Sequence, residues 1–209
     1  MNEILPLFPL QLVAFPGEAL NLHIFEPRYR QLIKESNETG ANFGIPAFID
    51  SKLQVFGTKM KLLSIEKTYT DGKMDIKTRG ISVFKIQKFL DKVPDKLYSG
   101  GKVEYLADNA NGDILLSNKI VVHLKELYRI MNIRKEIPSV ADFKTFDMGH
   151  HVGFTLEQEY ELLQLTGEQE RQEYMLAQLE HLIPTVRQME DLRKRVQMNG
   201  HFKDLIPPM

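Results

Sequence analysis

With 209 residues, 43% of them hydrophobic and 26% charged, the chain has an ordinary globular composition and can bury a core without covalent cross-links. The absence of cysteine excludes disulfides, thiolate metal sites and a cysteine nucleophile. A formal net charge of -1 gives no general attraction to nucleic acid or anionic lipid, and no apolar run approaches the ~20 residues of a membrane span. Because the first residues also lack the features of a signal peptide, we expect a cytoplasmic protein with no membrane partner.

The chain opens with an apolar segment, LPLFPL, in which Pro6 and Pro9 disfavour a helix. Such a segment suits a strand at a sheet edge or beside a bulge. The sequence Phe15-Pro16-Gly17 then predicts a turn, because proline presets φ and glycine accepts the left-handed conformation.

A second strand is expected over residues 20–25, and it runs directly into a helix. Pro27 stands in the first turn of that helix, where its missing N–H costs nothing. Tyr29, Leu32 and Ile33 follow at helical spacing and share one face. This face is predicted to pack on the core.

The clearest hairpin signal in the first half is Asp71-Gly72. Asp-Gly tolerates the positive φ angles of a type I′ turn and therefore favours a two-residue loop. After it, Met74 and Ile76 alternate with polar residues, as in a half-buried strand. Further strands are expected over residues 43–49, 59–69, 81–89 and 101–106.

Turn-forming residues concentrate in the sequence ADNANGD at 107–113, and the pattern beyond it becomes helical. A helix is expected over residues 115–133. Ser139, Thr155 and Thr166 each begin a sequence that fits a capping box, in which the first and fourth residues satisfy each other's backbone N–H groups.

The last of these boxes precedes an amphipathic helix that Pro184 should end or kink, with an apolar stripe continuing beyond it. Strand signals and helix signals are thus segregated along the chain, which predicts an α+β fold. We expect a β-rich domain with one inserted helix over residues 1–107 and an α-helical bundle over residues 108–209.

The order of features at the start of the chain is specific. An LPLFPL strand, a V-x-FPG turn and the sequence L-x-I-F-E-x-R-Y follow one another within about twenty-five residues. This run resembles the start of the substrate-binding domain family of ATP-dependent Lon proteases (protease La, peptidase S16). Farther along, an F-G-T sequence at 56–58, Asp71-Gly72 and a glycine and phenylalanine at 80 and 84 are similar to the same family in their order.

The resemblance implies a PUA-like β-barrel or β-sandwich with a helical bundle attached, acting as a non-enzymatic module that binds protein substrates. The implied partners are unfolded or extended protein segments and a separate ATP-dependent protease, in protein quality control or regulated proteolysis. An RNA-binding PUA-like module stays open as the alternative, because that fold class includes RNA readers.

Most apolar residues of the opening run are expected in the core. Glu26, Arg28 and Arg30 are read either as partner contacts or as an ion pair that holds the helix entry. We expect the binding site in the groove between the β half and the helices. The candidate peptide-binding residues are Phe15, Pro16, Phe25, Glu26, Arg28 and Tyr29.

The sequence lacks the catalytic signatures that an ATP-dependent protease needs, which argues against an enzyme. The sequence Gly100-Gly101-Lys102 hints at an ATP-binding P-loop, but Lys96 stands where the first glycine belongs and Val103 where Ser or Thr should bind magnesium. No G-x-S-x-G nucleophile elbow surrounds any serine. We therefore expect no catalytic residues and no cofactor.

Neither the histidines nor the basic residues form a clear site. Asp147, His150 and His151 lie close in sequence, but adjacent histidines point in different directions, so we expect a solvated helix end and no metal site. The basic residues 193–195 follow two acidic residues at 190–191, which favours a solvated helix face and makes nucleic acid an unexpected partner.

Overall fold

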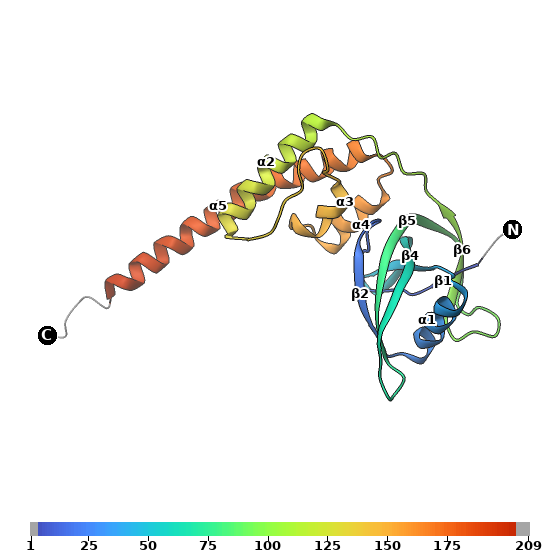
Figure 1. Cartoon of the computed structure of the whole chain (residues 1–209). Helices are drawn as coiled ribbons and strands as arrows, with labels where there is room; N and C mark the ends of the chain where they lie inside the picture. Colours follow the sequence, from blue (N-terminus) through green and yellow to red (C-terminus); the bar gives the residue numbers. More distant parts are fainter. Residues whose placement is uncertain (1–3, 204–209) are drawn as a thin grey trace.

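The computed structural model describes residues 4–203, with side chains described as far as Gln197, and has an α+β fold (Figure 1). Strands occupy the first half of the chain and helices most of the second. The strands are β1 Ile4–Leu7, β2 Ala19–Ile24, β3 Phe43–Ile49, β4 Lys52–Thr68, β5 Met74–Leu90 and β6 Ser99–Tyr105. The helices are α1 Pro27–Thr39, α2 Ile114–Met131, α3 Thr145–Met148, the 3-10 helix η1 Gly149–His151, α4 Leu156–Gln164 and α5 Glu168–Lys203.

All six strands belong to one sheet in the order β2-β5-β4-β3-β1-β6. An additional pairing of β5 with β6 closes five of these strands into a ring. The strand β2 lies outside this ring and pairs, among the described residues, with β5 alone. One edge of β2 is therefore open, whereas every strand of the ring has two neighbours.

The turn between β4 and β5 is of a different type from the one that the sequence predicts. Gly72 has a φ of 81°, but Asp71 has no positive φ, so the predicted two-residue type I′ turn is wrong. Tyr69 N–H instead donates to the Lys73 carbonyl at 2.9 Å, which leaves a three-residue loop. The Asp71 carboxylate accepts a hydrogen bond from Lys73 N–H, a local alternative that keeps the aspartate out of the left-handed region.

A two-residue turn with both φ angles positive occurs elsewhere, between β3 and β4. Asp50 and Ser51 have φ angles of 48° and 60°, and Ile49 pairs directly with Lys52 across this turn. Without a glycine or asparagine, the sequence gives no hint of it.

The long strand β5 continues through Gly80 and includes both the strand expected after Gly72 and the one expected over residues 81–89. A Cβ atom at Gly80 would lie 2.1 Å from the Phe15 carbonyl oxygen, so glycine is required for the close approach of another backbone segment. Glycine here permits a contact and does not end the strand.

The helix expected after β2 is confirmed. α1 begins at Pro27, and Tyr29, Leu32 and Ile33 are buried against the sheet. Gly40 ends the helix with a φ of 73°, the left-handed conformation common at helix C-termini.

In the second half, one of the three predicted capping boxes forms. Thr155 and Gln158 exchange both bonds at the start of α4. Ser139 begins only a turn, and α5 starts at Glu168 with Glu170 reaching back to Gly167 N–H, so Thr166 is not a cap.

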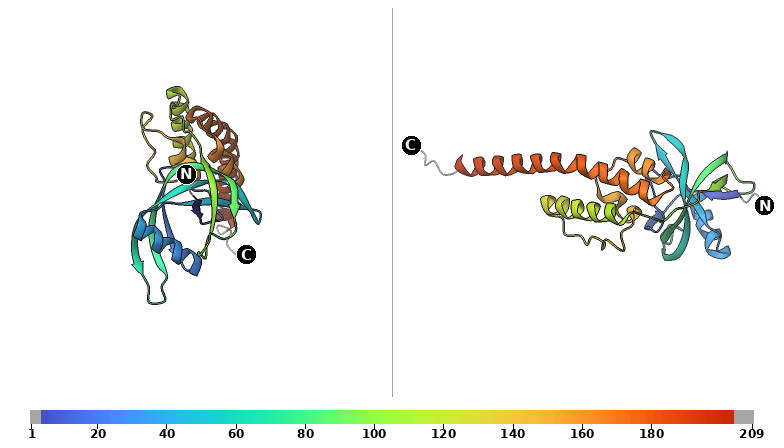
Figure 2. Two further views of the ribbon diagram at one scale, coloured as in Figure 1. Left: turned by 90° about the vertical axis from the view of Figure 1, so that its right-hand side faces the viewer. Right: turned by 90° about the horizontal axis from the view of Figure 1, so that it is seen from above.

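The final helix α5 continues through Pro184 to Lys203, so of the two effects expected of this proline, to end or to kink the helix, the first is wrong. Pro184 and Glu180, whose carbonyl loses its partner, are both exposed, so water can satisfy that carbonyl. At 36 residues the helix is about 54 Å long and projects well beyond α2 (Figures 1 and 2).

The core extends across the boundary between the two halves. One cluster lies within the sheet and α1, and a second lies between α2 and α5. A third cluster joins the two halves. In it, residues of the segment before β2 and residues of the sheet pack against α3 and α4. Its buried members are Val13, Phe15, Ala47, Ile49, Val83, Phe146, Leu162 and Leu163.

Candidate functional site

The N-terminal approach to β2 is buried where the two halves meet. Phe15 has no exposed surface, and its ring lies 5.2 Å from the Phe146 ring and 4.8 Å from the His150 ring between centroids. A Cβ atom at Gly149 would lie 2.4 Å from the Phe15 ring, so the helical segment approaches as closely as glycine allows. Phe15 therefore joins the halves and is inaccessible to a peptide.

The turn that follows Phe15 sets how β2 pairs with β5. Gly17 has a φ of 86°, and its N–H donates to the Gly80 carbonyl at 3.0 Å. Gly80 N–H in turn donates to the Glu18 carbonyl at 2.9 Å. Two residues thus oppose one, which is a β-bulge immediately before the strand.

His150 ties this turn to the helical half. Its Nδ1 lies 2.7 Å from a Glu159 carboxylate oxygen on α4, and its Nε2 lies 3.3 Å from Glu18. These hydrogen bonds, that with Glu159 being the stronger, raise the pKa of His150 to about 9, so near neutral pH it is an imidazolium between two carboxylates. His150, at the helix end that was expected to be solvated, thus keeps some exposed surface, with its side chain 32% exposed, and is also held by two carboxylates.

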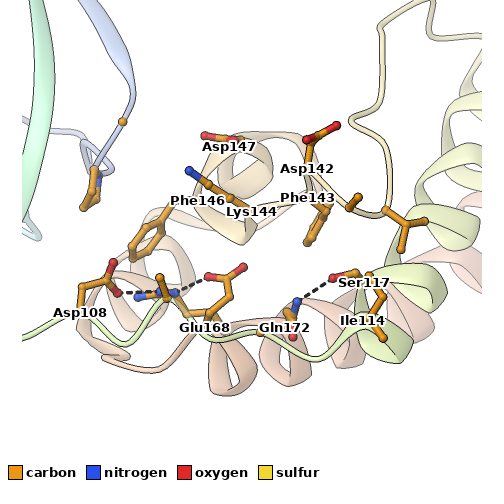
Figure 3. A pocket seen from close by; sticks show the side chains of 17 residues that line it. Asp108, Ile114, Ser117, Asp142, Phe143, Lys144, Phe146, Asp147, Glu168 and Gln172 are labelled. Atoms are coloured by element: carbon orange, nitrogen blue, oxygen red, sulfur yellow. Dashed lines mark hydrogen bonds and ion pairs between the residues drawn. The ribbon is translucent and has the colours of Figure 1, made fainter.

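We refer to Phe15, Glu18, Phe146, His150 and Glu159 as the clasp. Beside it lies a cavity of about 660 Å³, bounded by Pro16-Gly17, the linker before α2, the segment leading into α3, and the start of α5 (Figure 3). Pro16 is the sequence-predicted candidate that lines this cavity.

Arg171 lines this cavity, and its guanidinium group is paired with two carboxylates. The guanidinium lies 2.9 Å from Glu168, 2.8 Å from Asp108 and 4.2 Å above the Phe146 ring. Gln172 likewise donates to Ser117 at 2.8 Å. Every buried polar side-chain atom in the described part of the chain has a partner, so no buried charge is left for a ligand.

The C-terminal end of β2 has the opposite character. Phe25, directly after the strand, is 58% exposed. The His23 ring lies 6.3 Å from the Phe25 ring and 5.8 Å from the Tyr69 ring between centroids. Three aromatic rings therefore come together at this end, one of them largely open to solvent.

The Asp75 carboxylate organises these rings. One oxygen lies 2.6 Å from His23 Nδ1, and the other accepts the Tyr69 hydroxyl at 2.7 Å. These hydrogen bonds, chiefly that from His23, hold the pKa of Asp75 below its ordinary value. His23 and Asp75 are direct partners in the β2–β5 register, which fixes their separation.

The helix entry beyond Phe25 is held by local contacts. Arg28 and Glu26 form an exposed ion pair at 2.8 Å, as one of the two readings of these residues predicts, while the partner-contact reading stays a prediction. Arg28 also lies 4.5 Å above the ring of Tyr29, which is itself buried against Phe8 with centroids 3.9 Å apart. Arg30 donates to the Asp71 carbonyl at 2.6 Å and so joins the helix to the β4–β5 loop.

The six sequence-predicted residues therefore fall into two groups at opposite ends of β2, a strand of six residues spanning about 20 Å. Phe15 and Pro16 lie at the clasp and its cavity, whereas Phe25, Glu26, Arg28 and Tyr29 lie at the far end, where Tyr29 is a buried support. His23, Asp75 and Tyr69 were missed as a group. The alternation of Asp75 with apolar neighbours was their only signal in the sequence.

In the described part of the chain, no group of three His, Asp or Glu side chains is arranged so that it could hold a metal ion. Gly100 and Gly101 lie inside β6, where a Cβ atom at Gly100 would lie 2.7 Å from Ile4, so these glycines serve strand packing and not a phosphate loop. In the same part of the chain, no helix is both long and apolar enough to cross a bilayer.

The solved structures that are similar to this chain include two N-terminal domains of Lon type. A Lon N-terminal domain protein from Xanthomonas campestris is 24% identical, with a TM-score of 0.63 over 84% of this chain and 98% of that one. The N-terminal domain of a Mycobacterium avium complex Lon protease is 13% identical, with a TM-score of 0.61 over 85% of this chain and 98% of that one. Residues 4–181 match the family model of the ATP-dependent protease La (LON) substrate-binding domain. The chain belongs to that family of Lon substrate-binding domains.

Proposed function

We propose that this protein is a non-enzymatic module that binds unfolded or extended segments of client proteins, in protein quality control or regulated proteolysis. Membership of the Lon substrate-binding domain family supports protein substrates as the ligand class. The observation that carries the proposal is Phe25, a large apolar side chain 58% exposed beside two further aromatic rings. Exposed apolar side chains of this size suit the apolar side chains that unfolded proteins present.

The organisation of the chain fits this role. We propose that the closed ring of strands is a PUA-like barrel within a domain of residues 1–107, and that α2, α4 and α5 form a bundle within residues 108–209. The ring gives β2 a fixed platform, and the clasp holds the second unit against it. We place the protein in the cytoplasm, where an ATP-dependent protease would be its partner.

The accessible candidates define the proposed contact surface. Phe25, Glu26 and Arg28 present side chains to solvent at one end of β2. Phe15 and Tyr29 contribute as buried supports, and Pro16 lies at the separate cavity beside the clasp. The client is therefore expected at the open end of β2 and not in the groove between the two halves.

A titration tests this function. A permanently unfolded, carboxymethylated model protein with a fluorescent label is titrated with the purified chain, and anisotropy is recorded. Saturable binding in the micromolar range, with none of the folded form of the same protein, is expected. No binding of the unfolded probe, or tighter binding of single-stranded RNA that weakens steeply with salt, would contradict the proposal.

A further inference from the structure

The open edge of β2 has main-chain groups with no partner among the residues that the structure describes. Gly80 N–H donates to the Glu18 carbonyl, so the backbone of residue 18 faces β5. Because backbone groups alternate sides along an antiparallel strand, residues 20, 22 and 24 also face β5. The N–H and C=O groups of Ala19, Asn21 and His23 therefore point away from the sheet.

This edge lacks the features that normally protect an edge strand. Over Ala19–Ile24 the register with β5 is uninterrupted, and the sequence ALNLHI contains no proline and no Lys or Arg. By contrast, β1 carries Pro6 and is paired on both sides within the ring. The bulge at Gly17 ends before β2 begins, so it leaves the outward groups aligned.

A groove of about 310 Å³ lies over the face of the sheet at β2 and β5 and extends to Glu66 of β4. Asn21 and His23 of β2 line it together with Asp75 and Lys77 of β5. Phe25, directly after β2, is 58% exposed. Hydrogen-bonding groups along the edge and an apolar ring at its end are the two features by which sheet edges hold extended peptides.

We propose that an extended client segment adds to the sheet as a strand beside β2, pairing with the main chain of Ala19, Asn21 and His23 and placing an apolar side chain against Phe25. This proposal rests on the proposed function and specifies its site and geometry. Backbone pairing is independent of side-chain identity, so such a site accepts many client sequences, and Phe25 selects those with an apolar residue at one position.

The geometry favours a client over a second copy of this chain. In a two-fold antiparallel pair centred on Asn21, Phe25 of one copy would face Gly17 of the other. That position carries no apolar side chain and adjoins the ionic clasp. A self-pair would thus leave Phe25 uncovered, whereas a client strand can cover it.

The test substitutes one outward-facing N–H. Asn21→Pro removes that donor and places a ring on the edge, while the bonds between β2 and β5 stay in place. We expect the dissociation constant for the unfolded probe to rise about tenfold or more, since both a hydrogen bond and the close approach of the strand are lost. Asn21→Ala is the matched control for loss of the side chain, because it keeps the N–H, and it should raise the dissociation constant far less than Asn21→Pro does.

A second measurement leaves the protein unchanged. Two versions of a binding peptide are N-methylated at alternate residues, on one edge or on the other. Only the peptide methylated on the edge that faces β2 should lose binding. If circular dichroism shows that Asn21→Pro is misfolded, the two peptides alone test whether the client pairs with β2.

The outcomes separate the two proposals. If the wild type does not bind the unfolded probe, the proposed function fails. If folded Asn21→Pro binds like the wild type, or both methylated peptides bind equally, the β2 proposal is overturned while the function stands. A wild-type dimer that Asn21→Pro converts to a monomer, with unchanged probe binding, would assign the edge to self-association and also overturn it.

Discussion

The two ends of β2 differ in almost every physical respect although one short sequence run contains both. At the N-terminal end, Phe15 is fully buried between two rings of the helical half, and His150 bridges Glu18 to Glu159. At the C-terminal end, Phe25 is 58% exposed. The difference lies in residues 146–159, which cover one end and do not reach the other. A phenylalanine therefore supports the fold or offers a binding surface according to what a distant segment covers.

The largest expected effect on stability comes from a substitution at the buried, N-terminal end of β2. Phe15→Ala should lower the free energy of unfolding by about 3–5 kcal/mol, because it opens a cavity between Phe146 and His150 that the rigid backbone cannot fill. Phe25→Ala, the matched control at the other end, should change it by less than ~0.5 kcal/mol. Denaturant titration measures both, and equal losses would show that the ends do not differ.

Substituting Arg171, which pairs with Glu168 and lies above the ring of Phe146 in the clasp, should lower the free energy of unfolding nearly as much. Arg171→Gln leaves Glu168 buried without a countercharge and removes the cation above Phe146, so a loss of about 3 kcal/mol is expected. Arg193→Gln removes an exposed pair with Glu190 and should have almost no effect. Thermal denaturation of the two variants compares them, and similar melting temperatures would contradict a structural role for Arg171.

The clasp should also give the protein a measurable pH dependence. The pKa of His150 is raised to about 9 in the folded state from an ordinary 6.5, so its stabilisation is complete below pH 6.5 and is lost as the pH rises through 9. The loss should be about 1–2 kcal/mol once partial solvent screening is allowed for. His151, whose pKa burial lowers, titrates below this window.

His150→Gln provides the comparison for this prediction. Denaturant midpoints recorded from pH 6.5 to pH 10 should fall more steeply for the wild type than for the variant. Parallel curves would mean that His150 does not carry the pH dependence.

The smallest effect on stability is expected at the open end, where the effect on binding should be clear. Phe25→Ala should weaken binding of the unfolded probe several-fold and leave the melting temperature unchanged, because the ring makes few contacts within the fold. Leu97→Ala removes a side chain that is 56% exposed elsewhere on the surface and serves as the control. If both variants lose the same affinity, binding is a general property of exposed apolar surface.

Local sequence patterns predicted where helices and strands form better than they predicted the turns that connect them. The helical spacing of Tyr29, Leu32 and Ile33 was sufficient to place α1, because each turn depends on residues three or four positions away. The type of the turn at Asp71 was not predictable in the same way, since Gly72 takes the expected positive φ but Asp71 does not, and the Asp71 carboxylate accepts a hydrogen bond from Lys73 N–H. The overall α+β class followed from the separation of strand and helix signals along the chain.

The candidate site was less predictable because its two ends are defined by contacts distant in sequence. Phe15 meets Phe146 across 131 positions, and no local feature of the FPG turn reveals that contact. The pairing of His23 with Asp75 depends on the register of β2 against β5, which the bulge at Gly17 sets. The sequence run thus named the candidate residues as one group, and only the fold separated the buried supports from the exposed side chains.

Amide hydrogen exchange of the chain with and without the unfolded probe tests the central claim most directly. On binding, the amides of Asn21 and His23 should gain protection, because their N–H groups pass from water to a client backbone. The amides of Leu20 and Leu22, which already face β5, should change little. Protection confined to the cavity beside the clasp, for example at Ala110 and Lys144, with none at Asn21 and His23, would contradict the account.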